Sequence, residues 1–294
     1  MPRTFCIIGA GSVGQALAYL LHHAGWTFIG AASRKFESAS EACRFVGDGI
    51  PAEDKGELAN AADLIFVTTP DEAIAGVCEE LADQDAIRPG SVVAHCSGGL
   101  SSSVLEPARK CGAHIGSLHP LQTLPDPERG VALLPQSKCC VEGDEKAVET
   151  LREVVDSLGA EAFTIPTGRK ALYHAAAVMA CNYLVTLESV AVRMGEEAGM
   201  ESGTVLEAFL PLIRGTVTNL EDVGLPEEAL TGPIARGDVA TVRHHMEEIR
   251  ESMPQLLPLY CELARQTVQV ARRGGELDET EAEHMNRLIA SVLD

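Results

Sequence analysis

A strand that runs directly into three spaced glycines constrains this chain of 294 residues more than any other feature. The mostly apolar run from Thr4 to Ile8 is followed by glycines in the order G-x-G-x-x-G. In this fingerprint the first glycine permits a tight turn, the second lets a pyrophosphate approach the backbone, and the third lets helix and strand pack closely. The predicted cofactor-binding loop comprises Gly9, Ala10, Gly11, Ser12, Val13 and Gly14.

The residues around this loop have the pattern that a dinucleotide site needs. A helical segment over residues 15–24 ends at Gly25, and a second apolar run follows over residues 26–32. Together these segments form a β-α-β unit of about 30 residues, which is the context that the fingerprint requires. The helix that begins near Ser12 directs its free N–H groups and the positive end of its dipole at the phosphates.

The end of the second strand indicates which cofactor is bound. NAD-binding domains usually place an acidic residue there, where it bonds the ribose hydroxyls. This chain has Ser33, Arg34 and Lys35 instead. A hydroxyl and two cations suit a 2′-phosphate, so the sequence favours NADP(H) over NAD(H). The structural alternative is ordinary solvated charge at a strand end.

Composition excludes several other classes of protein. The net charge is −20 and no basic patch is visible, so we expect no nucleic-acid partner. The first strand begins at residue 4, so we expect no signal peptide. The most apolar stretch, residues 171–192, contains His174, Asn182 and Glu188, and is therefore predicted to be a buried core helix with no membrane role. The nine cysteines form no C-x-x-C pair, which predicts a reducing, cytoplasmic setting and no structural metal.

The chain changes character near residue 166. Up to that point short apolar runs alternate with helical segments, which predicts a doubly wound parallel α/β sheet over residues 1–166. Residues 167–294 show helical patterns only, which predicts an all-α domain. Its first helix, from Arg169 to about Ala198, is apolar on several faces and is predicted to be buried. That breadth fits a homodimer, although burial within one chain would give the same pattern.

Candidate site residues follow the predicted strands of the sheet. In open α/β sheets ligands bind at the carboxyl ends of the strands. Thr68, Thr69 and Pro70 follow one predicted strand, and Ser97 and Gly98 follow the next; both groups are expected to lie beside the ribose and nicotinamide. His119 follows a later strand and is expected to lie near a substrate. For His119 the structural alternative is a bond to a backbone carbonyl in its own turn.

The helical region supplies a second set of candidates. Lys170, His174 and Asn182 share one broad face of the predicted helix. His174 has the alternative of a satisfied core histidine, and Asn182 that of a link between helices. Arg236 lies in a loop rich in glycine and is a candidate clamp for a carboxylate, since guanidinium groups bind carboxylates in a bidentate fork. Its alternative is a surface charge or a pair with Asp238.

These motifs together resemble one family. The segments that carry the resemblance are residues 9–14, 96–98, 116–122, 173–176 with Asn182, and 231–238. The chain looks like the bacterial Rossmann-like proteins that carry a helical domain of unknown function 2520, which are similar to pyrroline-5-carboxylate reductase, ketopantoate reductase and the β-hydroxyacid dehydrogenases. The resemblance implies a nicotinamide-dependent reductase whose helical domain completes the site and often dimerises.

One departure from these relatives concerns the proton donor. The β-hydroxyacid dehydrogenases and ketopantoate reductases use a helix lysine four residues before an asparagine. If Asn182 is that asparagine, the lysine position is Val178, which donates no proton. His174 or His119 would have to replace the lysine, and histidine suits proton transfer because its unperturbed pKa lies near physiological pH.

The sequence therefore predicts an NADPH-dependent reductase of a small ketone or imine that carries a carboxylate, such as ketopantoate or a 2-keto acid. His119, His174 and Asn182 are the predicted catalytic residues, and Ser97, Gly98 and Arg236 the predicted substrate-binding residues. A cyclic-imine reductase of the pyrroline carboxylate type is a second enzyme hypothesis. A non-catalytic NADP-binding regulatory protein is the hypothesis from another class.

Overall fold

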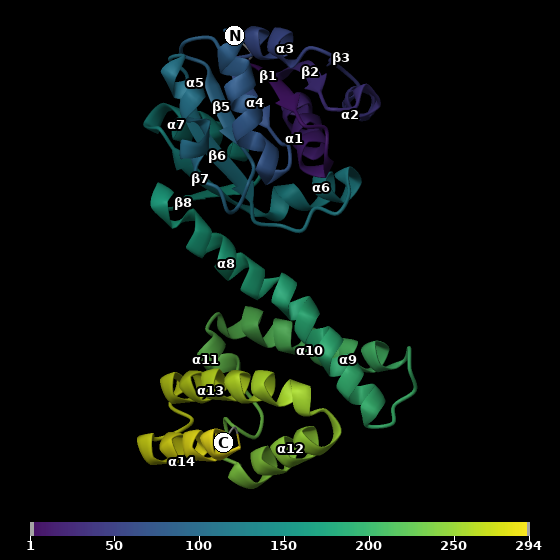
Figure 1. Ribbon diagram of the computed structural model, residues 1–294, viewed down its shortest axis with the longest axis vertical. Helices are drawn as coiled ribbons and strands as arrows, with labels where there is room; N and C mark the ends of the chain where they lie inside the picture. Colours follow the sequence, from purple (N-terminus) through teal and green to yellow (C-terminus); the bar gives the residue numbers. More distant parts are fainter. Residues whose placement is uncertain (1–2, 293–294) are drawn as a thin grey trace. The chain divides into compact units, whose positions relative to one another are not determined.

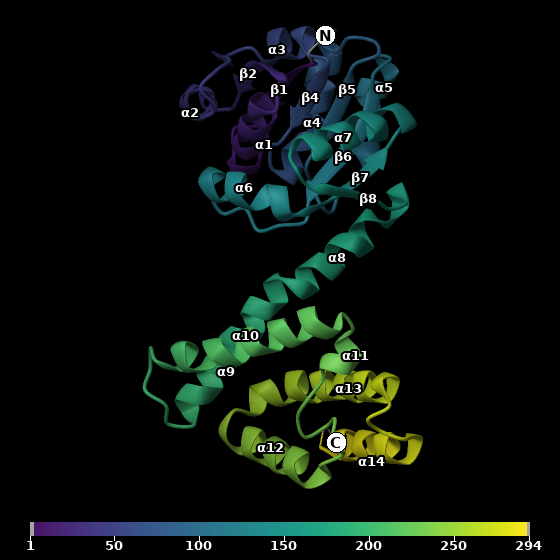
Figure 2. The ribbon, with the colours of Figure 1, turned by 180° about the vertical axis from the view of Figure 1, so that it is seen from behind.

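A computed structural model describes residues 3–292 and divides the chain into two compact units, residues 1–182 and residues 183–294. The division comes after the change of sequence pattern at residue 166, because the first helix of the helical region remains with the first unit. The ribbon of each unit is shown from two sides in Figures 1 and 2.

The first unit is built on one sheet of eight strands. In chain order they are β1 (Thr4–Ile8), β2 (Thr27–Ala32), β3 (Ile50–Ala52), β4 (Leu64–Val67), β5 (Val92–His95), β6 (His114–Pro120), β7 (Lys138–Gly143) and β8 (Glu161–Thr164). Their spatial order is β3-β2-β1-β4-β5-β6-β7-β8. The order reverses direction at β1, which is the switch point where doubly wound sheets bind nucleotides.

The prediction of a doubly wound, Rossmann-like sheet is confirmed, with one difference in strand direction. All neighbouring strands are parallel except β6 and β7, which pair antiparallel with His119 opposite Cys140. The connection from β6 to β7 brings the chain back along the adjacent strand. Because β6 itself runs parallel to β5, β4 and β1, its carboxyl end and His119 lie at the same edge of the sheet as the glycine loop.

Helices cover both faces of this sheet (Figures 1 and 2). In chain order they are α1 (Ser12–His23), α2 (Phe36–Val46), α3 (Lys55–Ala61), α4 (Asp71–Asp83), α5 (Glu106–Lys110), α6 (Pro127–Leu133) and α7 (Glu145–Ser157). The last helix of the unit, α8 (Lys170–Ala180), follows β8 and extends away from the sheet beyond its first turn. Successive side chains of a strand point to opposite faces. Accordingly, Phe5 and Ile7 of β1 pack in one core with α1, α2 and α7, whereas Cys6 and Ile8 pack in a second core with α3, α4 and α5.

The second unit is all helical, as predicted. Its helices are α9 (Asn182–Glu197, whose first residue belongs to the first unit), α10 (Val205–Val223), α11 (Pro226–Ala229), α12 (Val239–Ser252), α13 (Leu257–Gly274) and α14 (Glu279–Ser291). The core lies among α12, α13 and α14. Asp238 caps α12 by accepting the N–H of Thr241 at 3.0 Å, and Asp278 forms a capping box with Glu281 at the start of α14.

The prediction of one long buried helix over residues 169–198 is wrong in two respects. The helix is interrupted at Cys181, so that α8 and α9 are separate elements. Only Lys170 is buried in α8 and only Gly195 in α9. Residues 167–197 are long and apolar enough to cross a membrane, with a mean hydropathy of 1.6 in the most apolar window, and none of that window is buried. Its apolar character therefore does not come from a place in the core.

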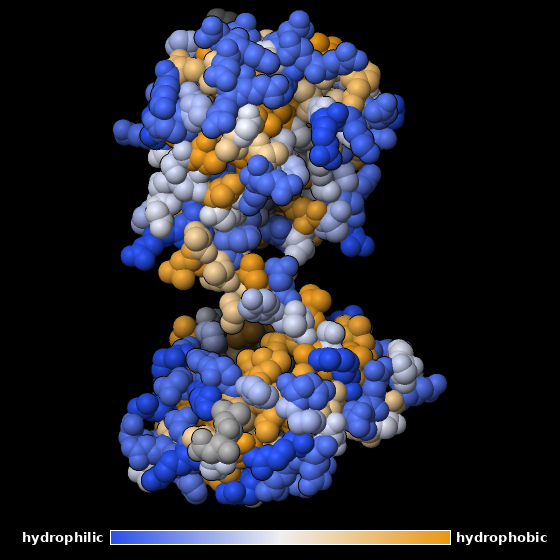
Figure 3. Space-filling model, viewed as in Figure 1, coloured by the Kyte–Doolittle hydropathy of each residue, from blue (hydrophilic) through white to orange (hydrophobic). Residues whose placement is uncertain are grey.

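Large apolar side chains are exposed on α8, α9 and α10. Figure 3 shows hydrophobic side chains on the surface of both units. The large ones on the three helices are Leu172 and Met179 of α8, Tyr183, Leu184 and Val185 of α9, and Leu206, Leu212, Val217, Leu220 and Val223 of α10. Leu172, Val185 and Leu212 are the most exposed of these, at 67%, 68% and 70%. Large exposed apolar patches usually mark an interaction surface.

Candidate functional site

The glycine loop has the shape that a pyrophosphate requires. Gly9 has a φ of +110°, and a Cβ there would lie 2.6 Å from the carbonyl carbon of Thr68. A Cβ on Gly14 would lie 2.6 Å from the carbonyl oxygen of Gly9. Gly11 differs, because nothing in the described chain lies within 4 Å of its Cβ position. Gly9 and Gly14 are therefore needed for packing, while Gly11 leaves open space against which a phosphate can lie.

The start of α1 is free to bind an anion. Gly11 is the N-cap residue, no side chain of the described chain caps the helix, and its first turn contains no acidic residue. Thr69 supplies a second sign of a ligand, since its buried Oγ1 has no hydrogen-bond partner among residues 3–292. The neighbouring Thr68 hydroxyl donates to the Gly9 carbonyl at 2.5 Å and so fixes the loop. Ala10, Ser12, Val13 and Pro70 lie in the same two segments. The residues present fit a dinucleotide.

The three residues after β2 lie where an adenosine ribose would be bound. Ser33 is half-buried, whereas Arg34 and Lys35 are exposed. Lys35 is the N-cap residue of α2. Neither cation makes an ion pair or hydrogen bond to another group in the part of the chain that the structure describes, so both are available for a 2′-phosphate.

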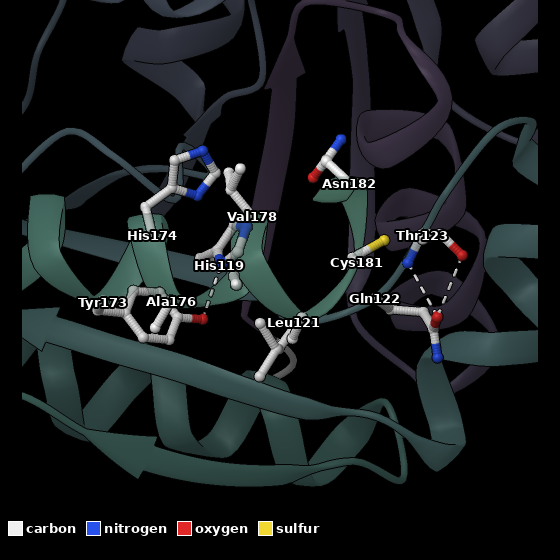
Figure 4. A pocket seen from close by; sticks show the side chains of 12 residues that line it. His119, Leu121, Gln122, Thr123, Tyr173, His174, Ala176, Val178, Cys181 and Asn182 are labelled. Carbon is white, nitrogen blue, oxygen red and sulfur yellow. Dashed lines mark hydrogen bonds between the residues drawn. The ribbon is translucent and has the colours of Figure 1, made fainter. Parts of the chain in front are cut away.

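A cavity of about 660 Å³ lies between the end of β6 and α8, and all residues that line it belong to the first unit (Figure 4). Its wall combines an apolar stretch of α8 with polar side chains from α8 and from the end of β6. The lining residues are His119, Leu121, Gln122, Thr123, Tyr173, His174, Ala176, Ala177, Val178, Ala180, Cys181 and Asn182. The structure thus brings together the three predicted catalytic residues, and it places Val178 in the wall beside them.

The two histidines form one compact group with Tyr173 and Gly98. The Tyr173 hydroxyl and Nδ1 of His119 are hydrogen-bonded at 2.8 Å (Figure 4). The rings of His119 and His174 are edge-to-face, with centroids 5.9 Å apart. A Cβ on Gly98 would lie 2.5 Å from His174 Nδ1 and 2.7 Å from His119 Nε2. Both imidazoles therefore occupy the space that a side chain at position 98 would fill.

The electrostatics of His119 differ from the sequence-based argument. Burial, followed by the charge of Lys170 and the proximity of His174, lowers the pKa of His119 to about 4. Near neutral pH the ring is therefore uncharged and donates or accepts hydrogen bonds without carrying a spare proton. The reason given for histidine as a proton donor, its unperturbed pKa, does not hold for His119.

The predicted substrate-binding residues lie in three different settings. Gly98 contacts both histidines, as described above. The Ser97 hydroxyl donates to Asp71 at 2.7 Å and accepts the N–H of Leu100 at 3.0 Å, so its side chain serves the loop and does not line the cavity. Arg236 is exposed on the second unit.

Sequence reasoning did not anticipate the position of Lys170. It was placed on one face with His174 and Asn182, but it does not line the cavity. Its side chain is only 1% exposed, and Nζ donates to Ser117 Oγ at 2.8 Å. Tyr173, a polar side chain on the mostly apolar helix α8, has the partner that burial requires in His119.

Comparison with known families identifies both halves of the chain. Residues 2–120 match the model of the Rossmann-like domain, and residues 137–267 match the model of the domain of unknown function 2520. The chain therefore combines a Rossmann-like domain with a domain of unknown function 2520, which confirms the relationship that the motifs indicated. No curated protein matches the sequence.

Solved structures show the same fold at low identity. Protein TM1727 from Thermotoga maritima is 25% identical, with a TM-score of 0.73, and the match covers 92% of this chain and 98% of that one. An imine reductase from Pseudomonas sp. is 17% identical, with a TM-score of 0.64 and full coverage of both chains. A pyrroline carboxylate reductase from Plasmodium falciparum, solved with NADP bound, is 13% identical, with a TM-score of 0.56 and coverage of 97% and 98%.

Proposed function

We propose that the protein is an NADPH-dependent reductase of a small ketone or imine. The observation that carries the proposal is the placement of the cavity with His119, His174 and Asn182 at the same sheet edge as a glycine loop whose open space fits a pyrophosphate. NADPH would lie on Gly11 and the start of α1, with its 2′-phosphate near Ser33, Arg34 and Lys35. The proteins of similar fold that are named as imine and pyrroline carboxylate reductases favour this class.

A bound NADPH would supply the hydride for the carbon of the C=O or C=N bond, and the oxygen or nitrogen would take up its proton from solvent. In this proposal His119 donates a hydrogen bond to that atom, and the Asn182 amide orients it. His174, whose Nδ1 is buried without a hydrogen-bond partner among residues 3–292, is the group in the cavity with an unused polar atom next to His119. Binding of a substrate carboxylate by Arg236 stays a prediction. The choice between a ketopantoate-type and a cyclic-imine substrate also stays a prediction.

The proposal is tested by following nicotinamide fluorescence during titration with NADPH and NADH. We expect tighter binding of NADPH, and we expect the double variant Arg34→Ala/Lys35→Ala to lose about tenfold or more of its NADPH affinity, because charge-assisted hydrogen bonds to the 2′-phosphate disappear. Arg44→Ala is the matched control, since Arg44 is an exposed arginine in the last turn of α2.

Turnover is then assayed with a panel of 2-keto acids, neutral ketones and cyclic imines. NADPH oxidation with any of them supports the reductase. Tight NADPH binding without turnover of any compound, joined to a change in oligomeric state, supports the non-catalytic regulatory protein instead. Equal affinity for NADPH and NADH, in the wild-type protein and in Arg34→Ala/Lys35→Ala alike, contradicts the assignment of Ser33, Arg34 and Lys35 to the 2′-phosphate.

We also propose that the exposed apolar side chains of α9 and α10 bind a second copy of the chain. The net charge of −20 disfavours an anionic lipid surface, and the apolar residues of α9 are interrupted by Asn182 and Glu188, which are costly in a bilayer. Sedimentation is expected to give a dimer, and the variant Val185→Asp/Leu212→Asp a monomer. A wild-type monomer that binds neutral lipid vesicles would overturn the proposal in favour of a membrane surface.

A further inference from the structure

Lys170 is a buried cation without a carboxylate partner. Three of the other lysines, Lys55, Lys138 and Lys146, form ion pairs with glutamates at the surface. Lys170 forms none within residues 3–292, and its ammonium group donates a hydrogen bond to the neutral Ser117 hydroxyl. Burial lowers the pKa of Lys170, which measures the cost of keeping an ammonium group there. A cation in this position calls for an explanation beyond folding.

The position within the helix adds to that cost. Lys170 is the first residue of α8, where the positive end of the helix dipole disfavours a cation. The carboxylates nearest to it are already engaged. Glu142 of β7 accepts the N–H and the hydroxyl of Ser102, at 2.7 and 2.8 Å, and Asp71 of α4 accepts the Ser97 hydroxyl. The charge of Lys170 is thus only partly compensated by its surroundings.

The contacts of Lys170 place this charge next to the residues that hold His119. Ser117 and His119 are two residues apart on β6, so their side chains leave the same face of the strand. On α8, Lys170 and Tyr173 are three residues apart and share a face of the helix. Lys170 contacts Ser117, Tyr173 contacts His119, and Nζ of Lys170 lies 5.7 Å from the centre of the Tyr173 ring. These two contacts hold the first turn of α8 against β6.

We propose that Lys170 is a positioning residue: its buried ammonium group, anchored on Ser117 beside Tyr173, adds a positive charge to the apolar surroundings of His119, so that His119 accepts the Tyr173 hydroxyl at Nδ1 and offers an N–H from Nε2 to the substrate. The proposal rests on the proposed function for the presence of a substrate, but its test needs none. The groups that face His119 are Lys170, His174 and Tyr173 of α8, Asp71 of α4 and His95 of β5. Of these, Lys170 is the cation.

The same charge acts on a second histidine. His95, fully buried at the end of β5, accepts the N–H of Ser97 at Nδ1. Its pKa is lowered to about 4, first by burial, and the charge of Lys170 contributes in the same direction. His95 does not line the cavity. His95 therefore provides a second reporter in the same protein, because a loss of the Lys170 charge is expected to raise the pKa of both histidines.

The test compares variants that differ in charge at position 170 but keep a hydrogen-bond donor there. Lys170→Gln removes the charge, Lys170→Arg retains it, and Lys138→Gln removes an exposed, ion-paired lysine of β7 as the matched control. Imidazole NMR signals are recorded from neutral pH down to about pH 4. The pKa of His119 is expected to rise toward its ordinary value in Lys170→Gln and to stay low in the other two proteins. In the wild type, nitrogen shifts are expected to show the proton on Nε2.

Two results overturn the proposal. The first is an unchanged His119 titration in folded Lys170→Gln, which would mean that burial alone keeps the ring uncharged. The second needs no variant: a Nζ signal of the wild-type protein that shows Lys170 as an uncharged amine at neutral pH removes the cation itself. Failure to bind NADPH or to reduce any substrate would contradict the proposed function and leave both of these measurements unaffected.

Discussion

Replacing Gly98 by alanine is expected to separate the two histidines and to reduce turnover by about 100-fold, because misplacement of a catalytic group by about 1 Å has this effect. The new Cβ would lie 2.5 Å from His174 Nδ1 and 2.7 Å from His119 Nε2, closer than side chains approach. Both distances are too short, so both rings have to shift, and the hydrogen bond of 2.8 Å between His119 and Tyr173 is strained or lost.

Gly99→Ala is the matched control for this variant. A Cβ on Gly99 would lie 3.5 Å from His174 Cδ2, which is an ordinary van der Waals contact. Both glycines lie in the same loop, so a general effect of alanine on that loop would appear in both variants. We measure NADPH oxidation and the melting temperature of each protein. Equal turnover in Gly98→Ala and Gly99→Ala would show that the histidine pair is not needed in its observed arrangement.

Local signals predicted much of the fold. The glycine loop follows from short-range geometry, and the structure confirms its shape. The direction of β7 could not be predicted, because a buried strand has the same apolar pattern whether it runs parallel or antiparallel. The break at Cys181 has no glycine or proline to announce it.

The site was partly predictable as well, because the position and polarity of a residue are local features of the sequence. His119 follows a strand, and His174 interrupts an apolar helix face, so position and polarity single out both. Lys170 at a helix start has the pattern of a solvated charge, and its burial comes from the packing of α8 against β6, which no local pattern contains. Likewise, an apolar helix in a sequence does not tell whether its partner is the same chain, a second copy or lipid.

The second large effect is expected at His119. His119→Ala is expected to lower turnover about 100- to 1000-fold, the usual cost of removing a hydrogen-bond donor to developing negative charge. His119→Gln is the more informative variant. A carboxamide N–H still donates a hydrogen bond but does not transfer a proton, so partial activity is expected if the uncharged ring acts as a donor. Activity in His119→Gln as low as in His119→Ala would favour proton transfer by His119 instead.

The pH profile separates the same two roles. A His119 pKa of about 4 means that the ring stays uncharged through the physiological range, so no change in rate near pH 6.5 is expected to depend on His119. A rate that falls with a midpoint near 6.5, and loses this midpoint in His119→Ala, would contradict the uncharged role.

The pH dependence of stability has to be measured alongside the rate. A histidine whose pKa is lower in the folded than in the unfolded state makes unfolding easier as the pH falls from the ordinary value of 6.5 toward 4, because the unfolded chain binds the proton first. His95, with its pKa also near 4, adds to this acid sensitivity. A loss of rate that follows the loss of folded protein below pH 6.5 therefore belongs to the fold, and only a loss measured on fully folded protein reports on the chemistry at His119.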